Sequence, residues 1–353
     1  MKILVTGISG RIGANLAKAL IEAGHEVRGL VWANDRRLDK LSALDVELVE
    51  GTIENPADTD KAVSGVDAIC HLAAAFQGGG PFSNAQYFEI NVRGTSNMLE
   101  AARQYAPNLQ HFFYASTDAI YDKYLPGGIA EPIREDRFKI APVGQYAVTK
   151  YLGEELCRGY HRTYQLPVTI FRFAMAMAGD EVLNFPQFYL SHWRKVYEKM
   201  AGEEAAAVRA QLQEIYATTG EGAQKCLLIA RDENGRSYKK HVADVRDIVR
   251  GFTDAVGKAG AGGKTGAVGE VFQLAAPAPY TWEETVPYLA QKLGADMVDV
   301  RLLGNTPTFY EFDMSKGKRL FDYQPSYDML RMIDDALAFR EGQATGVIPT
   351  HVR

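Results

Sequence analysis

The segment Met1–Gly13, MKILVTGISGRIG, decides the fold of this chain. A short apolar strand runs into the spacing Gly7-x-x-Gly10-x-x-Gly13, and a helical run, Ala14–Glu22, follows. Gly7 permits a tight turn, Gly10 lets the backbone approach a pyrophosphate, and Gly13 lets the helix pack close to the strand. The helix N-terminus adds free N–H groups and the positive end of its dipole. Because a strand precedes the glycines and a helix follows them, the segment predicts a dinucleotide site rather than a plain strand–turn–helix connection.

The first half of the chain continues this alternation of apolar runs and helical patterns, which is typical of a parallel sheet with helices on both faces. Because the connections are short, we expect right-handed crossovers and an α/β fold with one doubly wound parallel sheet of the Rossmann type. The expected strands are Lys2–Thr6, Glu26–Val31, Val46–Glu50, Ala68–Leu72, His111–Ala115 and Val168–Phe173. The expected helices are Arg11–Ala23, Asp58–Val63, Tyr87–Tyr105 and Gly144–Tyr164.

Beyond Phe173 the pattern changes. A long, charged, alanine-rich helical region runs from Gln187 to about Ala217, and further strand and helix patterns follow it. We therefore expect a dinucleotide-binding domain at residues 1–175. Residues 176–353 are expected to form a smaller, mostly C-terminal substrate lobe, interleaved with elements that return to the main sheet.

Composition excludes several classes of partner. The net charge of −5 gives no electrostatic reason to expect nucleic acid or an anionic membrane. The three cysteines lack paired spacing, and the seven histidines show no helical pair four residues apart, so we expect no disulfide framework and no metal site. Since neither a secretory leader pattern nor a bilayer-long apolar run is visible, we expect a cytoplasmic protein.

Tyr146 and Lys150 lie four residues apart at the start of a helical run, so both side chains point the same way. An ammonium near a phenol favours the phenolate and lowers the tyrosine pKa toward neutral pH. Such a tyrosine can take a proton from an alcohol while a hydride leaves the alcohol carbon, or return one to a carbonyl. Tyr288 and Lys292 share the spacing, but they lie in a late helical pattern, and we interpret them as helix surface.

Two hydroxyl residues, Ser116 and Thr117, follow the strand pattern His111–Ala115. A hydroxyl at the carboxyl end of a parallel strand faces the crevice in which such sheets bind ligands. The alternative is that these side chains satisfy backbone groups at the end of the strand.

Five ordered motifs together resemble the extended short-chain dehydrogenase/reductases of the NAD-dependent epimerase/dehydratase type. Their order and spacing agree over about the first 175 residues, and weaker matches continue beyond. The motifs are Thr6-Gly7-x-x-Gly10-x-x-Gly13, His71-Leu72-Ala73-Ala74, Asn91-Val92-Arg93-Gly94-Thr95, Ser116-Thr117-x-x-Ile120-Tyr121 and Tyr146-x-x-x-Lys150.

The resemblance implies a catalytic set. Thr117 would hydrogen-bond the reacting oxygen, Tyr146 would be the acid/base, and Lys150 would bind the nicotinamide ribose hydroxyls and hold down the pKa of Tyr146. Ser116 would lie behind these groups. The sequence also carries Ala119 where the family's 4,6-dehydratases have a second carboxylate, so dehydration is not expected.

The resemblance also implies the cofactor contacts. Ala73 and Ala74 would pass under the cofactor, and Asn91 would support that side of the site. Thr52 and Ile53 stand where the family often has Asp-Leu against the adenine, which weakens that expected contact. The full expected set is Gly7, Gly10, Arg11, Ile12, Gly13, Arg36, Thr52, Ile53, Leu72, Ala73, Ala74, Asn91, Ser116, Tyr146 and Lys150.

The choice between NAD and NADP depends on the end of the second strand. An acidic residue there selects NAD by accepting a hydrogen bond from the ribose 2′-hydroxyl, but this chain has Val31 and Trp32. The guanidinium groups of Arg36 and Arg37 follow, and such groups suit a 2′-phosphate. We expect NAD(P), with a preference for NADP. The alternative is that the arginines are solvated and that Asp35 replaces the missing acid.

Three functions follow from this sequence. The first is an NAD(P)-dependent oxidoreductase that moves a hydride between nicotinamide and a secondary alcohol or ketone. The second is a sugar or nucleotide-sugar epimerase with tightly bound NAD, and the third is a non-catalytic NAD(P)-sensing protein. Met175 replaces an asparagine that the family's nucleotide-sugar enzymes usually carry, which favours the first function. We expect a small hydroxyl- or carbonyl-bearing substrate, and the resemblance suggests a homodimer.

Overall fold

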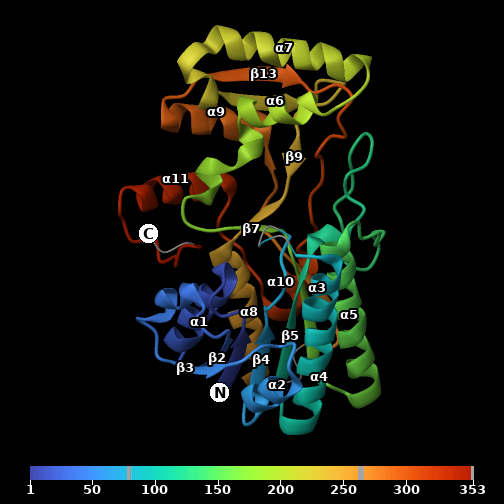
Figure 1. Ribbon diagram of the computed structural model, residues 1–353, viewed down its shortest axis with the longest axis vertical. Helices are drawn as coiled ribbons and strands as arrows, with labels where there is room; N and C mark the ends of the chain where they lie inside the picture. Colours follow the sequence, from blue (N-terminus) through green and yellow to red (C-terminus); the bar gives the residue numbers. More distant parts are fainter. Residues whose placement is uncertain (78–79, 81, 261–265, 351–353) are drawn as a thin grey trace.

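The computed structural model describes residues 1–77, 80, 82–260 and 266–350. Within them, seven parallel strands form one sheet in the order β11-β6-β5-β4-β1-β2-β3 (Figure 1). The apolar runs predicted these strands because a strand covered on both faces is apolar throughout. The strands are β1 (Lys2–Thr6), β2 (Glu26–Val31), β3 (Val46–Glu50), β4 (Ala68–His71), β5 (His111–Thr117), β6 (Val168–Phe173) and β11 (Val271–Leu274).

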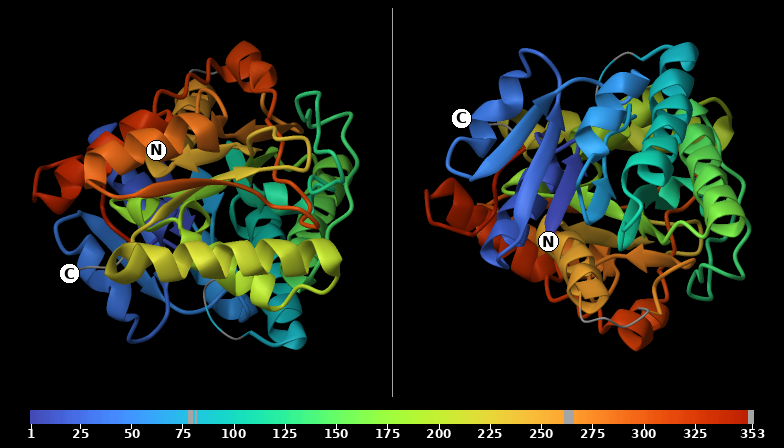
Figure 2. Two further views of the ribbon diagram at one scale, coloured as in Figure 1. Left: turned by 90° about the horizontal axis from the view of Figure 1, so that it is seen from above. Right: turned by 90° about the horizontal axis from the view of Figure 1, so that it is seen from below.

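Helices cover both faces of the sheet (Figure 2). On one face, α1 (Arg11–Glu22) packs against α8 (Val245–Gly260), and α10 (Ser315–Phe321) lies beside β11. On the other face lie α2 (Pro56–Val63), α4 (Gly94–Tyr105) and α5 (Gln145–Tyr164). The predicted doubly wound α/β fold is therefore confirmed, and β11, α8 and α10 show that the second half of the chain contributes to the sheet layer.

A helical lobe stands above the sheet in Figure 1 and consists of α6 (Leu190–Glu198), α7 (Glu203–Thr219), β8 (Leu227–Arg231), α9 (Trp282–Leu293) and β13 (Met297–Arg301). β8 (Leu227–Arg231) pairs in parallel with β13 (Met297–Arg301), and α9 (Trp282–Leu293) packs on this ribbon. The expected single helical region from Gln187 is wrong in one respect. It is divided into α6 (Leu190–Glu198) and α7 (Glu203–Thr219), because Gly202 adopts a φ of +105° that an α-helix does not contain.

Two short ribbons join the sheet to the helical lobe. In one, β7 (Met175–Met177) pairs in parallel with β10 (Val242–Asp244). In the other, β9 (Lys239–Lys240) pairs antiparallel with β12 (Tyr280–Thr281). After α11 (Met329–Arg340) the chain returns to the sheet layer, where the Asn15 amide exchanges hydrogen bonds of 2.8 and 2.9 Å with the backbone of Ile348.

Two further boundaries differ from expectation, and both affect the site. The predicted helix from Tyr87 to Tyr105 begins earlier, as α3 (Asn84–Phe88), and passes through a π-helical turn, Glu89–Arg93, before α4. Such turns insert one extra residue and often occur at functional sites. β5 continues to Thr117, so both expected hydroxyl residues belong to the strand itself.

Candidate active site

The glycine loop joins β1 to α1 beside the residues that follow β4. A Cβ atom at Gly7 would lie 2.9 Å from Ala73 N, and one at Gly13 would lie 2.2 Å from Gly7 O. Backbone packing alone therefore requires glycine at both positions. Among the described residues no side chain caps α1 at Gly10, so side chains leave the N–H groups of its first turn available. The loop fits a dinucleotide pyrophosphate, which binds to such N–H groups.

Arg11 links this loop to the segment that leads into the helical lobe. Its guanidinium forms a 2.6 Å salt bridge with Glu181 and donates a 3.0 Å hydrogen bond to Ala176 O. It also donates to Thr350 Oγ1 at 2.9 Å. Ile12 packs against the apolar core under α1. No local sequence pattern indicates that Arg11 spans the two parts of the molecule in this way.

A carboxylate lies beside the glycine loop, in the turn that follows β2. Asp35 Oδ2 accepts a 2.6 Å hydrogen bond from Ser9 Oγ, and Arg37 donates to Asp35 through two nitrogens, each at 2.8 Å. Burial alone would raise the pKa of Asp35, but these hydrogen bonds outweigh it and lower the pKa to about 2. Because Arg37 is paired and Arg36 is exposed, the expected preference for NADP finds no support.

Sequence reasoning missed Lys40, which also approaches this loop. Its side chain is buried, and Nζ donates a 3.1 Å hydrogen bond to Ser9 O. Burial is the largest cause of the lowered pKa of Lys40. The residue lies in a 3-10 turn, Arg36–Leu41, whose short polar pattern resembles surface loop.

The floor of the site is the segment after β4, and polar groups hold it against the glycine loop. Thr6 Oγ1 accepts hydrogen bonds from Leu72 N at 3.2 Å and Ala73 N at 3.1 Å, and it bonds His71 Nδ1 at 2.8 Å. Burial, followed by the charge of Lys150, lowers the pKa of His71 to about 3, so this imidazole is neutral. Leu72, Ala73 and Ala74 therefore lie beside Gly7, where they were expected.

Asn91 fixes the next part of the floor and lies in the π-helical turn. Its side chain accepts a 2.7 Å hydrogen bond from Ala75 N and donates to Ala75 O at 3.1 Å and to Thr149 Oγ1 at 3.0 Å. It thereby ties the segment after β4 to α5. At the other end of the floor, Ile53 is buried against Gly94, where a Cβ would lie 2.6 Å from Ile53 Cδ1, so its side chain faces the core.

Thr117 and Tyr146 meet at the carboxyl end of β5. The hydroxyl of Thr117 accepts from Ala119 N at 3.2 Å and lies close enough to the Tyr146 phenol to lower its pKa. The Tyr146 ring makes edge contacts with the rings of Phe76, at 5.6 Å between centroids, and Tyr87, at 6.5 Å. Burial raises the pKa of Tyr146 to about 12, and the Thr117 hydroxyl opposes this rise.

Lys150 lies one turn further along α5, with Nζ 4.1 Å from the centroid of the Tyr114 ring. Burial lowers the pKa of Lys150 to about 7. The expectation that Lys150 lowers the pKa of Tyr146 is therefore wrong for this arrangement. Burial acts on both groups and disfavours the charged form of each, so the ammonium that would stabilise a phenolate is itself only partly charged at neutral pH.

Behind these residues lies a buried ionic network that the sequence did not indicate. Glu154 of α5 accepts hydrogen bonds from Ser116 Oγ at 2.6 Å and from Arg172 of β6 at 2.9 and 2.7 Å. Arg172 also donates to Tyr121 Oη at 2.8 Å, and Arg158 donates to Glu154 at 2.9 Å. Ser116 is thus a structural partner of Glu154, and the network fixes α5 relative to β5 and β6.

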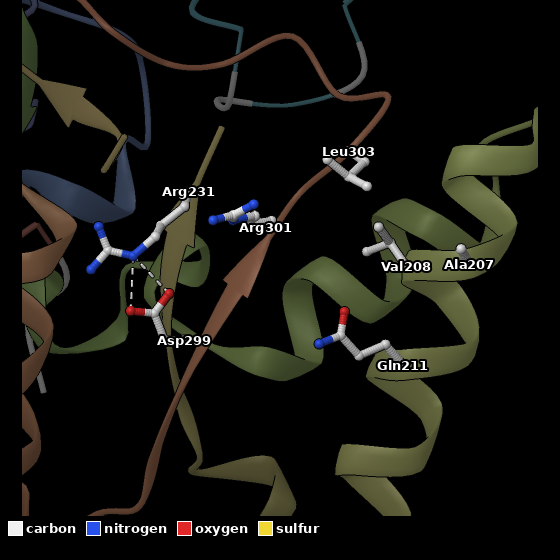
Figure 3. Close-up of a pocket in the computed structure, with 7 residues that line it drawn as sticks. All are labelled: Ala207, Val208, Gln211, Arg231, Asp299, Arg301 and Leu303. Atoms are coloured by element: carbon white, nitrogen blue, oxygen red, sulfur yellow. Dashed lines mark hydrogen bonds and ion pairs between the residues drawn. The ribbon is translucent and has the colours of Figure 1, made fainter. Parts of the chain in front are cut away.

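A hollow of about 490 Å³ lies elsewhere, between α7 and the β8–β13 ribbon (Figure 3). Arg231 and Asp299 line it and form a 2.8 Å salt bridge there. Its other lining side chains include Val208 and Gln211 of α7. Neither Thr117 nor Tyr146 lines this hollow, so it is separate from the candidate active site.

The family model described as "NAD dependent epimerase/dehydratase family" matches residues 3–269. The chain belongs to this family. The match covers all the strands of the sheet except β11, together with the glycine loop, Thr117, Tyr146 and Lys150. The resemblance read from the five sequence motifs is therefore confirmed.

Curated relatives match parts of the chain. A probable UDP-glucuronate 4-epimerase of Rhizobium meliloti is 35% identical over 187 residues, which make up 49% of this chain and 52% of that protein. A 3-beta-hydroxysteroid dehydrogenase of Mycolicibacterium neoaurum is 38% identical over 125 residues, which make up 34% of this chain and 32% of the relative. The chain thus spans about half of the first relative and about a third of the second.

A solved structure agrees over nearly the whole length. It is a short-chain dehydrogenase/reductase superfamily protein from Agrobacterium tumefaciens with bound NAD, 28% identical, with a TM-score of 0.77. The comparison covers 97% of this chain and 98% of that one, so the likeness includes the helical lobe.

The described residues contain neither a helix that could cross a membrane nor a cluster of metal ligands. No helix among residues 1–77, 82–260 and 266–350 is long and apolar enough to cross a membrane. Within the same part of the chain, His, Cys, Asp and Glu side chains form no group of three or more that could hold a metal ion.

Proposed function

We propose that this protein is an NAD-dependent epimerase that acts on a sugar or sugar derivative through transient oxidation of a secondary hydroxyl group. The observation that carries the proposal is the contact between Thr117 and Tyr146 beside the floor of the glycine-loop site. A hydroxyl and a phenol that lie this close can together hold one substrate oxygen and exchange its proton.

The glycine loop, the floor residues Leu72–Ala74 and Lys150 are the groups that would hold the dinucleotide. When bound, its nicotinamide supplies a hydride acceptor and donor. Asp35 supports NAD rather than NADP, because a carboxylate held beside the loop accepts from a ribose 2′-hydroxyl and repels a 2′-phosphate.

The protein's own residues handle the proton. Thr117 donates to the substrate oxygen and holds it against Tyr146. Tyr146 first loses its own proton, which its raised pKa opposes. As a hydride then leaves the carbon, the hydroxyl proton passes to the ionised Tyr146 oxygen and a carbonyl forms. The protonated phenol, which its raised pKa favours, then returns the proton while hydride comes back to the opposite face of the carbonyl carbon. Atoms and electrons balance over this cycle, and the configuration at one carbon is inverted.

The epimerase reaction is supported by the relative named as a UDP-glucuronate 4-epimerase and by the family description. A net oxidoreductase is the second candidate. It is supported by the relative named as a 3-beta-hydroxysteroid dehydrogenase and by Met175, a partly exposed apolar side chain where the family's nucleotide-sugar enzymes carry asparagine.

Release of the bound dinucleotide from denatured protein, followed by mass spectrometry, separates the two. An epimerase regenerates its cofactor in each turnover, so we expect near-stoichiometric NAD that survives purification. An empty site that binds and releases dinucleotide reversibly would instead support the oxidoreductase. Binding of neither NAD nor NADP would refute both.

A further inference from the structure

A cluster of charged groups lies between the carboxyl end of β5 and the β9–β12 ribbon. Asp118 follows Thr117 directly and forms a salt bridge with Lys123. Lys240 of β9 is close enough to both residues for their charges to affect its pKa. All three are buried, with exposed fractions of 8%, 4% and 3% for Asp118, Lys123 and Lys240. At this point a single carboxylate, which is already paired, faces two ammonium groups.

The ammonium group of Lys240 has few polar contacts for a buried cation. Its Nζ donates a long hydrogen bond of 3.3 Å to Gln187 Oε1 and lies 4.8 Å from the centroid of the Phe185 ring. An ammonium has three N–H donors, and burying it is costly unless it is paired. Burial, followed by the charge of Lys123, lowers the pKa of Lys240 to about 8. A bound anion would offset both the cost of burying this ammonium group and its repulsion by Lys123.

Tyr280 gives a second, independent indication. It lies directly opposite Lys240 in the antiparallel β9–β12 pair, so the two side chains project from the same face. Its side chain is buried, and among the described residues its hydroxyl has no hydrogen-bond partner. Buried hydroxyl groups in native proteins are almost always hydrogen-bonded. A hydroxyl without a hydrogen-bond partner therefore lies across the strand pair from a lysine whose opposite charge, Asp118, is already paired with Lys123.

The neighbouring residue on the same strand, Lys239, is a lysine whose ammonium group has a charged partner. Lys239 projects from the opposite face of β9, where Nζ forms a 2.7 Å salt bridge with Glu311. It also lies 4.5 Å from the centroid of the Phe309 ring. Lys239 is therefore a matched control for Lys240.

We propose that Lys240 and Tyr280 bind an anionic group of the substrate, a carboxylate or a phosphate. Lys123 adds positive charge at the same place. Because Asp118 follows Thr117, the anion is held on the substrate beside the carbon whose hydroxyl group reacts at Tyr146. This inference rests on the proposed function, since the anion belongs to the substrate of that site.

The test is calorimetric titration of the NAD-loaded full chain with glucose, glucuronate and glucose 1-phosphate. We expect the wild type to bind one charged sugar at least about tenfold more tightly than glucose, as a hydrogen bond to a charged group allows. A preference for glucuronate assigns the group as a carboxylate, and a preference for glucose 1-phosphate assigns it as a phosphate. Equal affinity for all three sugars, or binding of none, overturns the proposal.

Three variants sharpen the test. Lys240→Met should abolish the preference for the charged sugar, whereas Lys239→Met should keep it. Tyr280→Phe should weaken binding of the charged sugar about threefold, the effect of one lost hydrogen bond, without lowering the melting temperature. Equal losses in the Lys239→Met and Lys240→Met variants would overturn the proposal.

Epimerisation is measured separately, as formation of the inverted sugar followed by nuclear magnetic resonance. Its absence in the wild type, combined with a preference for charged sugars that depends on Lys240, would refute the proposed function and leave the anion site standing. The reverse result would refute the anion site alone.

Discussion

Replacing Glu154 by glutamine should destabilise the protein strongly. Glu154 and Arg172 are 0% and 1% exposed, and hydrogen bonds of 2.9 and 2.7 Å join them. The glutamine keeps the size of the side chain but leaves the Arg172 guanidinium without its counter-charge, and Ser116 loses a charged acceptor. Breaking a buried pair from one side costs about 3–5 kcal/mol, and we expect a loss of this size in the free energy of unfolding.

Urea unfolding followed by circular dichroism measures this loss. The matched control is the double variant Glu154→Leu with Arg172→Met, which removes both charges and fills the space with apolar side chains. Its loss should be smaller than the sum of the losses in the two single variants, because neither charge is left unpaired. Additive losses, or a loss below about 1 kcal/mol for Glu154→Gln, would show that the network does not behave as a buried ion pair.

The same network predicts a dependence on pH. Burial raises the pKa of Glu154, but the hydrogen bonds and charge of Arg172, with the Ser116 hydrogen bond, outweigh it and lower the pKa below its ordinary value. A carboxyl group with a lowered folded-state pKa stabilises the protein above its unfolded-state pKa. That stability is lost as pH falls through the folded-state value. Glu154→Gln should lack this part of the acid destabilisation.

Three other changes test the site. Tyr146→Phe should abolish epimerisation, seen as loss of the inverted sugar product, while leaving the dissociation constant of NAD near that of the wild type; retained epimerisation would refute the acid/base role. Asp35→Asn should improve NADP binding relative to NAD by about tenfold in fluorescence titrations, because it removes a carboxylate that repels the 2′-phosphate; an unchanged ratio would show that Asp35 does not select the ribose. The pKa of Lys150 is about 7 in the folded chain, below its ordinary value, so the unfolded chain binds the extra proton above neutral pH and stability should rise with pH there. Lys150→Met should remove that rise in urea unfolding curves.

Much of the fold could be predicted because its strands are buried on both faces. The runs that became β1, β2 and β3 were predicted with the correct bounds, since an apolar segment between turn residues leaves few alternatives. The helical lobe was harder to predict. Its elements are short, and the division between α6 and α7 depends on the backbone conformation of Gly202, which spacing alone does not reveal.

The two Tyr-x-x-x-Lys pairs show the limit of spacing in a different way. The Tyr288 hydroxyl and the Lys292 ammonium both bind Asp334 on the surface, the latter at 2.6 Å. Tyr146 and Lys150 are held instead between Thr117 and Tyr114. The position of each pair along the sequence distinguished the pair beside Thr117 from the surface pair. The pKa of Tyr146 could not be predicted in the same way, because burial depends on tertiary packing.

The sequence by itself determined the glycine loop, the positions of most sheet strands along the chain and the presence of Thr117, Tyr146 and Lys150, because each depends on local backbone geometry or on helical and strand periodicity. Only the tertiary structure placed Glu154 against Arg172, Arg11 against Glu181 and Lys240 opposite Tyr280. These partners are separated by 18, 170 and 40 residues along the chain. Such pairings, and the shifted pKa values that follow from them, arise where distant segments exclude water together, and no local pattern encodes that.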